Sequence, residues 1–174
     1  EEWSPKPLVS SGGIAFVGSY VLGMGFILTA EQAHSLLSAD PRNADVVYPF
    51  LSGEDINSQP GHEPSRWVIN FWDWPEEKAR TYEAPWLWIE ERVKPERQRL
   101  DENGKFVLRK PLPDRWWQHA DKRPGLYHAV GRGHLFEQHP KEWDPSRKPH
   151  REVLVSALVG KHFNPAVIPN DLIF

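Results

Sequence analysis

The residue types that could carry chemistry in this chain are its histidines, its carboxylates and a run of basic and aromatic side chains. The eight histidines contain no HExxH pattern, so a zinc-hydrolase helix is not indicated. Three of them, His134, His139 and His150, share one irregular segment and could meet a metal ion. Solvated loop histidines are the simpler interpretation, and we predict no metal site.

The carboxylate pairs and the glycines are equally weak signals. Glu54-Asp55 and Glu90-Glu91 are adjacent in sequence, and adjacent positions on a helix do not face each other. We expect these pairs on solvated surfaces. Gly23-x-Gly25 lacks the third glycine and the following helix of a dinucleotide-binding loop. The sequence therefore predicts no catalytic residue in this chain.

Basic and aromatic residues alternate over residues 92–123, which hold ten Lys/Arg against five Asp/Glu. Such a segment can neutralise phosphates, and its Arg and Gln side chains can also read base edges. The alternative is the solvated face of a charged helix. Residues 1–79 hold four Lys/Arg against eleven Asp/Glu. The net charge of −3 is therefore the sum of an acidic first part and a basic later segment. Because local charge steers a polyanion to a surface, the net charge of the whole chain excludes only a histone-like mode of polyanion binding.

The 174 residues are 39% hydrophobic and 26% charged, which indicates a single soluble domain. Cysteine is absent, which excludes disulfides and thiolate sites and favours a cytoplasmic location. We see no signal peptide. Glycines and polar residues interrupt the uncharged run 14–30, so we expect two strands there and no membrane span. Because the chain starts at Glu1 and its one methionine is Met24, we expect an excised domain or a processed product.

Short helices are predicted where capping signals and apolar spacing agree. Thr29 stands three residues before Gln32, a capping-box arrangement that predicts a helix over residues 30–39. Pro95 interrupts a second helical pattern. The further segments expected to be helical are residues 75–82, 86–99 and 126–130.

Strands are predicted where β-branched and aromatic residues alternate or cluster. Residues 66–72 alternate most clearly and place Arg66, Asn70 and Trp72 on one face, open to a ligand or to water. The other predicted strands are residues 46–51 (at an edge, because of Pro49), 151–159 and 166–168. With no regular βαβ rhythm, this mixture predicts an α+β fold with mixed, mostly antiparallel sheets, short flanking helices and long loops.

Nine tryptophans raise a second class of binding protein. Exposed tryptophan rings stack on sugars as well as on bases, so a tryptophan-rich carbohydrate-binding module is the alternative to a nucleic-acid-binding domain. Most of the tryptophans lie within apolar patterns, and we expect them chiefly in the core.

The order of several long segments separates these two classes. In sequence order the chain contains GSYVLGMGFILT, DPRNADVVYPFLSGEDINSQP, PSRWVINFWDWPEEKA, VKPERQR, RWWQHADKRPGLYHAV and LVSALVGKHFNPAVIPNDLIF. Across residues 13–174 this series resembles the target-recognition region of MmeI-like enzymes, with TaqI-type specificity domains as wider relatives. In these enzymes a gamma-class, adenine-specific DNA methyltransferase is followed by a sequence-reading domain, sometimes with an endonuclease fused ahead.

The resemblance implies double-stranded DNA as the partner and a parent methyltransferase domain in cis. That parent would belong to a bacterial or phage restriction–modification system and would use S-adenosylmethionine to methylate the exocyclic amine of a flipped adenine. The methyltransferase signature Asn/Asp/Ser-Pro-Pro-aromatic, a glycine-rich S-adenosylmethionine loop and the PD-(D/E)xK nuclease pattern do not occur in this sequence. We therefore expect this chain to bind no cofactor and to supply sequence recognition only.

Candidate DNA contacts follow from the same resemblance. Flexible cationic side chains reach phosphates without fixed base geometry, and we expect four of them on the DNA backbone: Lys94, Arg97, Arg115 and Lys161. The family's usual Ser-Lys reads Gly160-Lys161 here, which keeps the lysine. The segment 132–148 departs from the family pattern, as segments that set specificity do. The base-readout candidates are His134, Arg147, Arg151 and His162.

Overall fold

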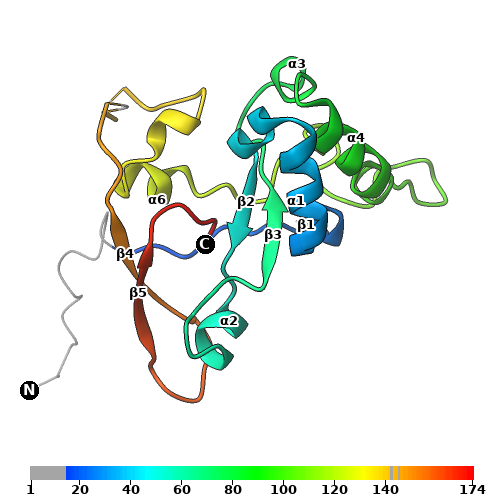
Figure 1. The fold of residues 1–174 in the computed structure, drawn as a ribbon. Helices are drawn as coiled ribbons and strands as arrows, with labels where there is room; N and C mark the ends of the chain where they lie inside the picture. Colours follow the sequence, from blue (N-terminus) through cyan, green and yellow to red (C-terminus); the bar gives the residue numbers. More distant parts are fainter. Residues whose placement is uncertain (1–14, 142, 145) are drawn as a thin grey trace, which may run out of the picture.

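The computed structural model describes residues 15–141, 143–144 and 146–174, with 32% of the chain in helix and 16% in strand. Two small antiparallel sheets and short helices make this an α+β fold, as predicted (Figure 1). The first sheet has the strand order β1-β3-β2, and the second pairs β4 with β5. The strands are β1 (Ile27–Leu28), β2 (Val47–Phe50), β3 (Arg66–Ile69), β4 (Glu152–Ser156) and β5 (Pro165–Pro169).

Short helices surround the three-stranded sheet, and α1 packs beside it (Figure 1). Both halves of the predicted capping box are present in α1, since Thr29 Oγ1 accepts from Gln32 N and Gln32 Oε1 accepts from Thr29 N. The α-helices are α1 (Ala30–Ala39), α2 (Gly53–Ser58), α3 (Glu76–Ala79), α4 (Glu83–Arg92), α5 (Lys94–Arg97) and α6 (Pro124–Ala129). The 3-10 turns are η1 (Met24–Phe26), η2 (Pro41–Asp45) and η3 (Gly133–Leu135).

β3 is the central strand of its sheet, so both of its edges are paired, and its last two residues, Val68 and Ile69, are buried. The expected ligand-facing positions of Asn70 and Trp72 are wrong, because both side chains are buried. The strand ends at Ile69, and Trp72 adopts a left-handed φ of 53°. The Asn70 side-chain oxygen accepts from Trp72 N at 2.9 Å and so stabilises this turn into the core.

The two strands expected within residues 14–30 do not form; only the two-residue β1 is present in the described part of that segment. Upstream of it, Tyr20 makes an isolated bridge to Asp121. Gly25 shows why this region needs glycine, because a Cβ there would lie 2.7 Å from the Val93 side chain. Among the described residues no helix is long and apolar enough to cross a membrane.

Tryptophans form much of the core, as predicted. Trp86 packs on Trp116 with ring centroids 4.8 Å apart, and Trp117 Nε1 donates to the Trp74 carbonyl oxygen at 2.9 Å. These aromatic rings join α4 to the segment that follows α5. Among the described tryptophans, five are buried: Trp72, Trp74, Trp86, Trp116 and Trp117.

The missed helix α2 begins with a complete capping box. Ser52 Oγ accepts from Asp55 N at 3.3 Å, and the Asp55 carboxylate accepts from Ser52 N at 2.8 Å. Burial opposes ionisation of Asp55, but hydrogen bonds from Ser65 and Ser52 lower its pKa below the usual value. The buried carboxylate therefore stays charged and keeps the first turn of α2 in place.

Removing this cap has a measurable cost. Ser52→Ala leaves an N-terminal amide of α2 without its acceptor, and we expect the free energy of unfolding to fall by about 1 kcal/mol. Ser58→Ala, at the exposed other end of the same helix, is the control and should stay close to wild type. Equal urea-denaturation midpoints for the two variants would contradict the role of the cap.

His119 is a buried, neutral group that couples stability to pH. Its Nε2 donates to the Ile69 carbonyl oxygen at 2.8 Å, and burial lowers its pKa to about 4. In the unfolded chain the pKa returns to about 6.5. Between these values the unfolded state binds more protons, so stability is lost as the pH falls from about 6.5 to about 4.

This titration should contribute about 3 kcal/mol to the difference in unfolding free energy between pH 7 and pH 4. Urea unfolding across this range measures it, and His119→Gln should flatten the pH dependence. His34→Gln, at an exposed position on α1, should keep the wild-type slope. An unchanged slope in His119→Gln would show that the lost stability comes from other groups.

Candidate nucleic-acid interface

The antiparallel hairpin of β4 and β5, here called the ribbon, has one buried and one exposed face. Its register pairs Glu152 with Pro169 and Ser156 with Pro165. The inner face packs on a small core that includes Leu51. On the outer face the directly paired Leu154 and Val167 are 72% and 64% exposed. The ribbon therefore presents a free face to solvent (Figure 1).

The loop at the tip of the ribbon, residues 157–164, is fastened to α2. Asn57 Nδ2 donates to the Val159 carbonyl oxygen at 3.0 Å, and Asn164 Nδ2 donates to the Ile56 carbonyl oxygen at 3.1 Å. The two hydrogen bonds lie on either side of Lys161 and His162. Both of these side chains are exposed.

The other end of the ribbon is fastened to the end of α6. Asn170 Nδ2 donates to the carbonyl oxygens of Val130 and His150, at 2.8 and 3.0 Å. Gly131 has a φ of 81°, and a Cβ there would lie 2.1 Å from the Lys148 carbonyl oxygen. The loop 146–151 can approach α6 this closely only because residue 131 has no side chain.

The ribbon brings four of the predicted contact residues onto one element. Arg147 and Arg151 lie at its base and Lys161 and His162 at its tip, all exposed. Residues 146–163 hold four Lys/Arg and one acid, Glu152. No ion pair within the described part of the chain involves any of these four Lys/Arg residues. Their positive charge is therefore available to an anionic partner.

Sequence reasoning missed two basic residues of the same surface. Lys148 and His150 lie in the loop 146–151 and are exposed. Both stand beside the predicted Arg147 and Arg151, so a local charge count over residues 146–163 would have found them. Their inclusion concentrates the basic side chains at the base of the ribbon.

The remaining candidates are not part of the ribbon. Lys94 forms a 2.7 Å ion pair with Glu90 on α4, and its hydrogen bond lowers the pKa of that carboxyl. Arg115 is exposed and precedes Trp116, which packs on α4, across the three-stranded sheet from the ribbon (Figure 1). His134 is exposed in η3 after α6. The structure therefore does not join Lys94 or Arg115 to the ribbon surface.

The prediction that Arg97 contacts a phosphate needs correction, because its side chain is 1% exposed. Arg97 Nη2 donates to the carbonyl oxygens of Val21 and Leu22, at 3.0 and 2.6 Å, and burial lowers its pKa. The guanidinium is therefore turned inward and holds the segment before η1. The sequence carries a signal for this, because Arg97 stands four residues after the buried Val93 on the same helical face.

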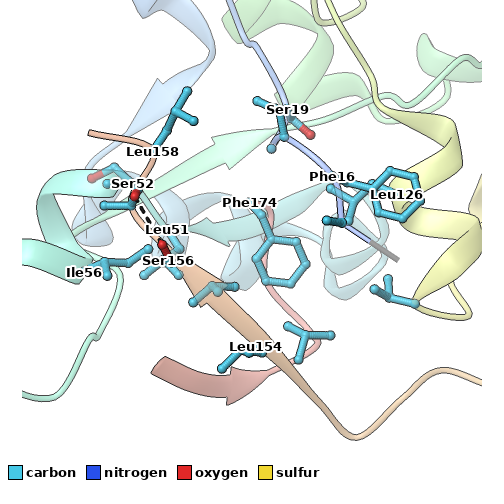
Figure 2. A pocket seen from close by; sticks show the side chains of 18 of the residues that line it. Phe16, Ser19, Leu51, Ser52, Ile56, Leu126, Leu154, Ser156, Leu158 and Phe174 are labelled. Carbon is cyan, nitrogen blue, oxygen red and sulfur yellow. Dashed lines mark hydrogen bonds between the residues drawn. The ribbon is translucent and has the colours of Figure 1, made fainter. Parts of the chain in front are cut away.

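An open groove of about 1200 Å³ runs along β4, between α2 and α6. Figure 2 shows Phe16 and Leu126 on one side of this space, Leu51 on another, and Phe174 between them. Arg147 and His150 also contribute to its lining. Within the described residues no three His, Asp or Glu side chains come together as a metal site.

Comparisons with protein-family models, with curated proteins and with solved structures find no match for this chain. The function of its candidate site is therefore inferred from the residues of the site. What they define is an α+β domain with an exposed β-ribbon whose base and tip are both basic.

The close approach at Gly131 can be tested against a matched glycine. Gly104 also has a positive φ, 72°, but a Cβ there would meet nothing within 4 Å. Gly104→Ala should cost about 1 kcal/mol of unfolding free energy, from backbone strain alone. Gly131→Ala should cost about 3 kcal/mol, because the Lys148 backbone must also move. Equal losses in thermal unfolding would show that the loop 146–151 is not packed against α6.

Proposed function

We propose that this chain is a double-stranded DNA-recognition domain that reads its site with the β4–β5 ribbon. The observation that carries this proposal is the exposed antiparallel ribbon with cations at both ends and none of them in an ion pair within the described residues. The major groove of B-DNA, about 12 Å wide, admits a two-stranded β-ribbon. The fold thus supplies an element of suitable shape and charge.

The length of the ribbon indicates which of its side chains can contact phosphates and which can contact bases. The five residues of β4 span about 17 Å, more than the width of the groove. Cations at the two ends can therefore face phosphates on opposite sides, with Lys161 at one end and Arg147 or Arg151 at the other. Leu154 and Val167, between the ends, are placed to contact thymine methyl groups.

The resemblance of the sequence to the target-recognition region of MmeI-like enzymes supports the same proposal. On this view a methyltransferase domain elsewhere in the polypeptide binds S-adenosylmethionine and methylates the adenine. The present chain positions that domain on the DNA and transfers no methyl group itself. Catalysis then depends on the ribbon only through the choice of site.

The carbohydrate-binding alternative loses its main support. This alternative rests on exposed tryptophan rings on which sugars would stack, yet none of the described tryptophans is among the largely exposed hydrophobic side chains. Trp143, the one described tryptophan in the histidine-rich loop, is half-buried and stacks on His128 with centroids 4.6 Å apart. Trp3 lies outside the described residues.

The test is a salt series of duplex binding by the whole 174-residue chain, with a fluorescent random-sequence duplex as the probe. Phosphate contacts make log K fall linearly with log salt between about 50 and 200 mM. Lys161→Ala should weaken binding and reduce this slope by about 1. Lys105→Ala, a cation equally exposed in the 100–107 turn, is the matched control and should leave both unchanged.

Two results would overturn the proposal. One is the absence of duplex binding at the lowest salt, and the other is an affinity that does not change with salt. An equal effect of Lys161→Ala and Lys105→Ala would instead assign the binding to general charge and remove the ribbon from it. Selection of duplexes from the random pool then tests whether the chain prefers one sequence.

A further inference from the structure

The tip of the ribbon exposes large apolar side chains where a solvated loop would carry polar ones. Leu158, Val159 and Phe163 are 83%, 82% and 83% exposed, more than any other large hydrophobic side chain in the described part of the chain. Lys161 and His162 lie between them in sequence. The tip therefore combines apolar surface with positive charge.

Two of these side chains share one side of the tip. Leu158 and Phe163 line a single hollow of about 440 Å³, together with Phe16 and Val17. The loop that carries them is held at both flanks, through Asn57 to the Val159 carbonyl and through Asn164 to α2. Because the backbone is hydrogen-bonded on both sides, the apolar side chains are presented at a defined place.

The neighbouring charges indicate what covers this apolar tip. Residues 146–163 carry a net charge of +3, from four Lys/Arg and one Glu. Of these four cations only Lys161 lies at the tip, because the other three lie at the base of the ribbon. An apolar tip with one cation beside it complements stacked bases next to a phosphate. Proteins that bind the minor groove of DNA use this combination when they insert Phe or Leu between base steps, which partly unstacks and kinks the duplex.

We infer that the tip loop is a wedge: Phe163, with Leu158 beside it, inserts between two base pairs of the bound duplex while Lys161 contacts an adjacent phosphate. This inference rests on the proposed function. Pyrimidine–purine steps such as TA and CA/TG are flexible and are the easiest to unstack and kink. The wedge therefore favours sites with such a step under the tip, even where no side chain reads a base edge.

The experiment uses the whole chain and the tightest-binding duplex selected from a random pool. Dyes on the two duplex ends report bending by energy transfer, and 2-aminopurine at successive positions reports unstacking by its fluorescence. On binding the wild-type chain, energy transfer should rise and 2-aminopurine should brighten at one step. Phe163→Ala should lose both signals but keep the salt dependence of binding, since it removes no charge.

Leu87→Ala is the control, because Leu87 is an exposed apolar residue on α4, across the three-stranded sheet from the ribbon. It should keep the bending and the unstacking signals. Thermal melting checks the fold of both variants, and each replaced side chain is largely exposed, so neither should shift the midpoint.

The outcomes separate the wedge from the proposed function. No duplex binding by the wild-type chain overturns the proposed function and the wedge with it. Duplex binding without bending or unstacking overturns the wedge alone, as does an unchanged signal in Phe163→Ala. Sedimentation of the free chain gives a further arm: a dimer that Phe163→Ala dissociates, with DNA bending intact, would assign the tip to contact between copies.

Discussion

The buried guanidinium of Arg132 is the contact on which the placement of the ribbon depends. It lies 5.3 to 5.5 Å from the ring centroids of Tyr48, Trp72 and Tyr127 and donates to the Leu172 carbonyl oxygen. Burial lowers its pKa, and the surrounding aromatic rings help to stabilise its charge. One side chain thereby connects the three-stranded sheet, the end of α6 and the segment after β5.

This connection matters because a two-stranded hairpin is marginal by itself in water. The segment after β5 returns to the first sheet, where Ile173 bridges Phe50 and its backbone amide donates to the Pro49 carbonyl oxygen. Asn170 and the α2 side chain Asn57 hold the two ends of the ribbon. The ribbon's outer face can therefore stay apolar and exposed, since its stability comes from contacts behind it and at its ends.

Local patterns in the sequence predicted the elements whose deciding contacts are local. The helix after Thr29 follows from a side chain and an amide three residues apart, and both ribbon strands follow from clustered β-branched residues. The prediction failed for Asn70, Trp72 and Arg97, because their burial depends on the turn into the core and on the distant segments packed around them. The holding contact from Asn164 to Ile56 joins residues 108 positions apart, which no local pattern reveals.

By itself, then, the sequence determined the α+β class, the aromatic core and the presence of basic side chains near residues 147–162, because composition and short-range periodicity carry this information. Only the tertiary structure decided which cations share a surface. It turned Arg97 inward, put Lys94 in an ion pair, and left Arg147, Arg151, Lys161 and His162 exposed on one ribbon. The physical reason is that exposure and proximity are set by contacts between segments far apart in the chain, such as that of Arg97 with the Val21 and Leu22 carbonyl oxygens.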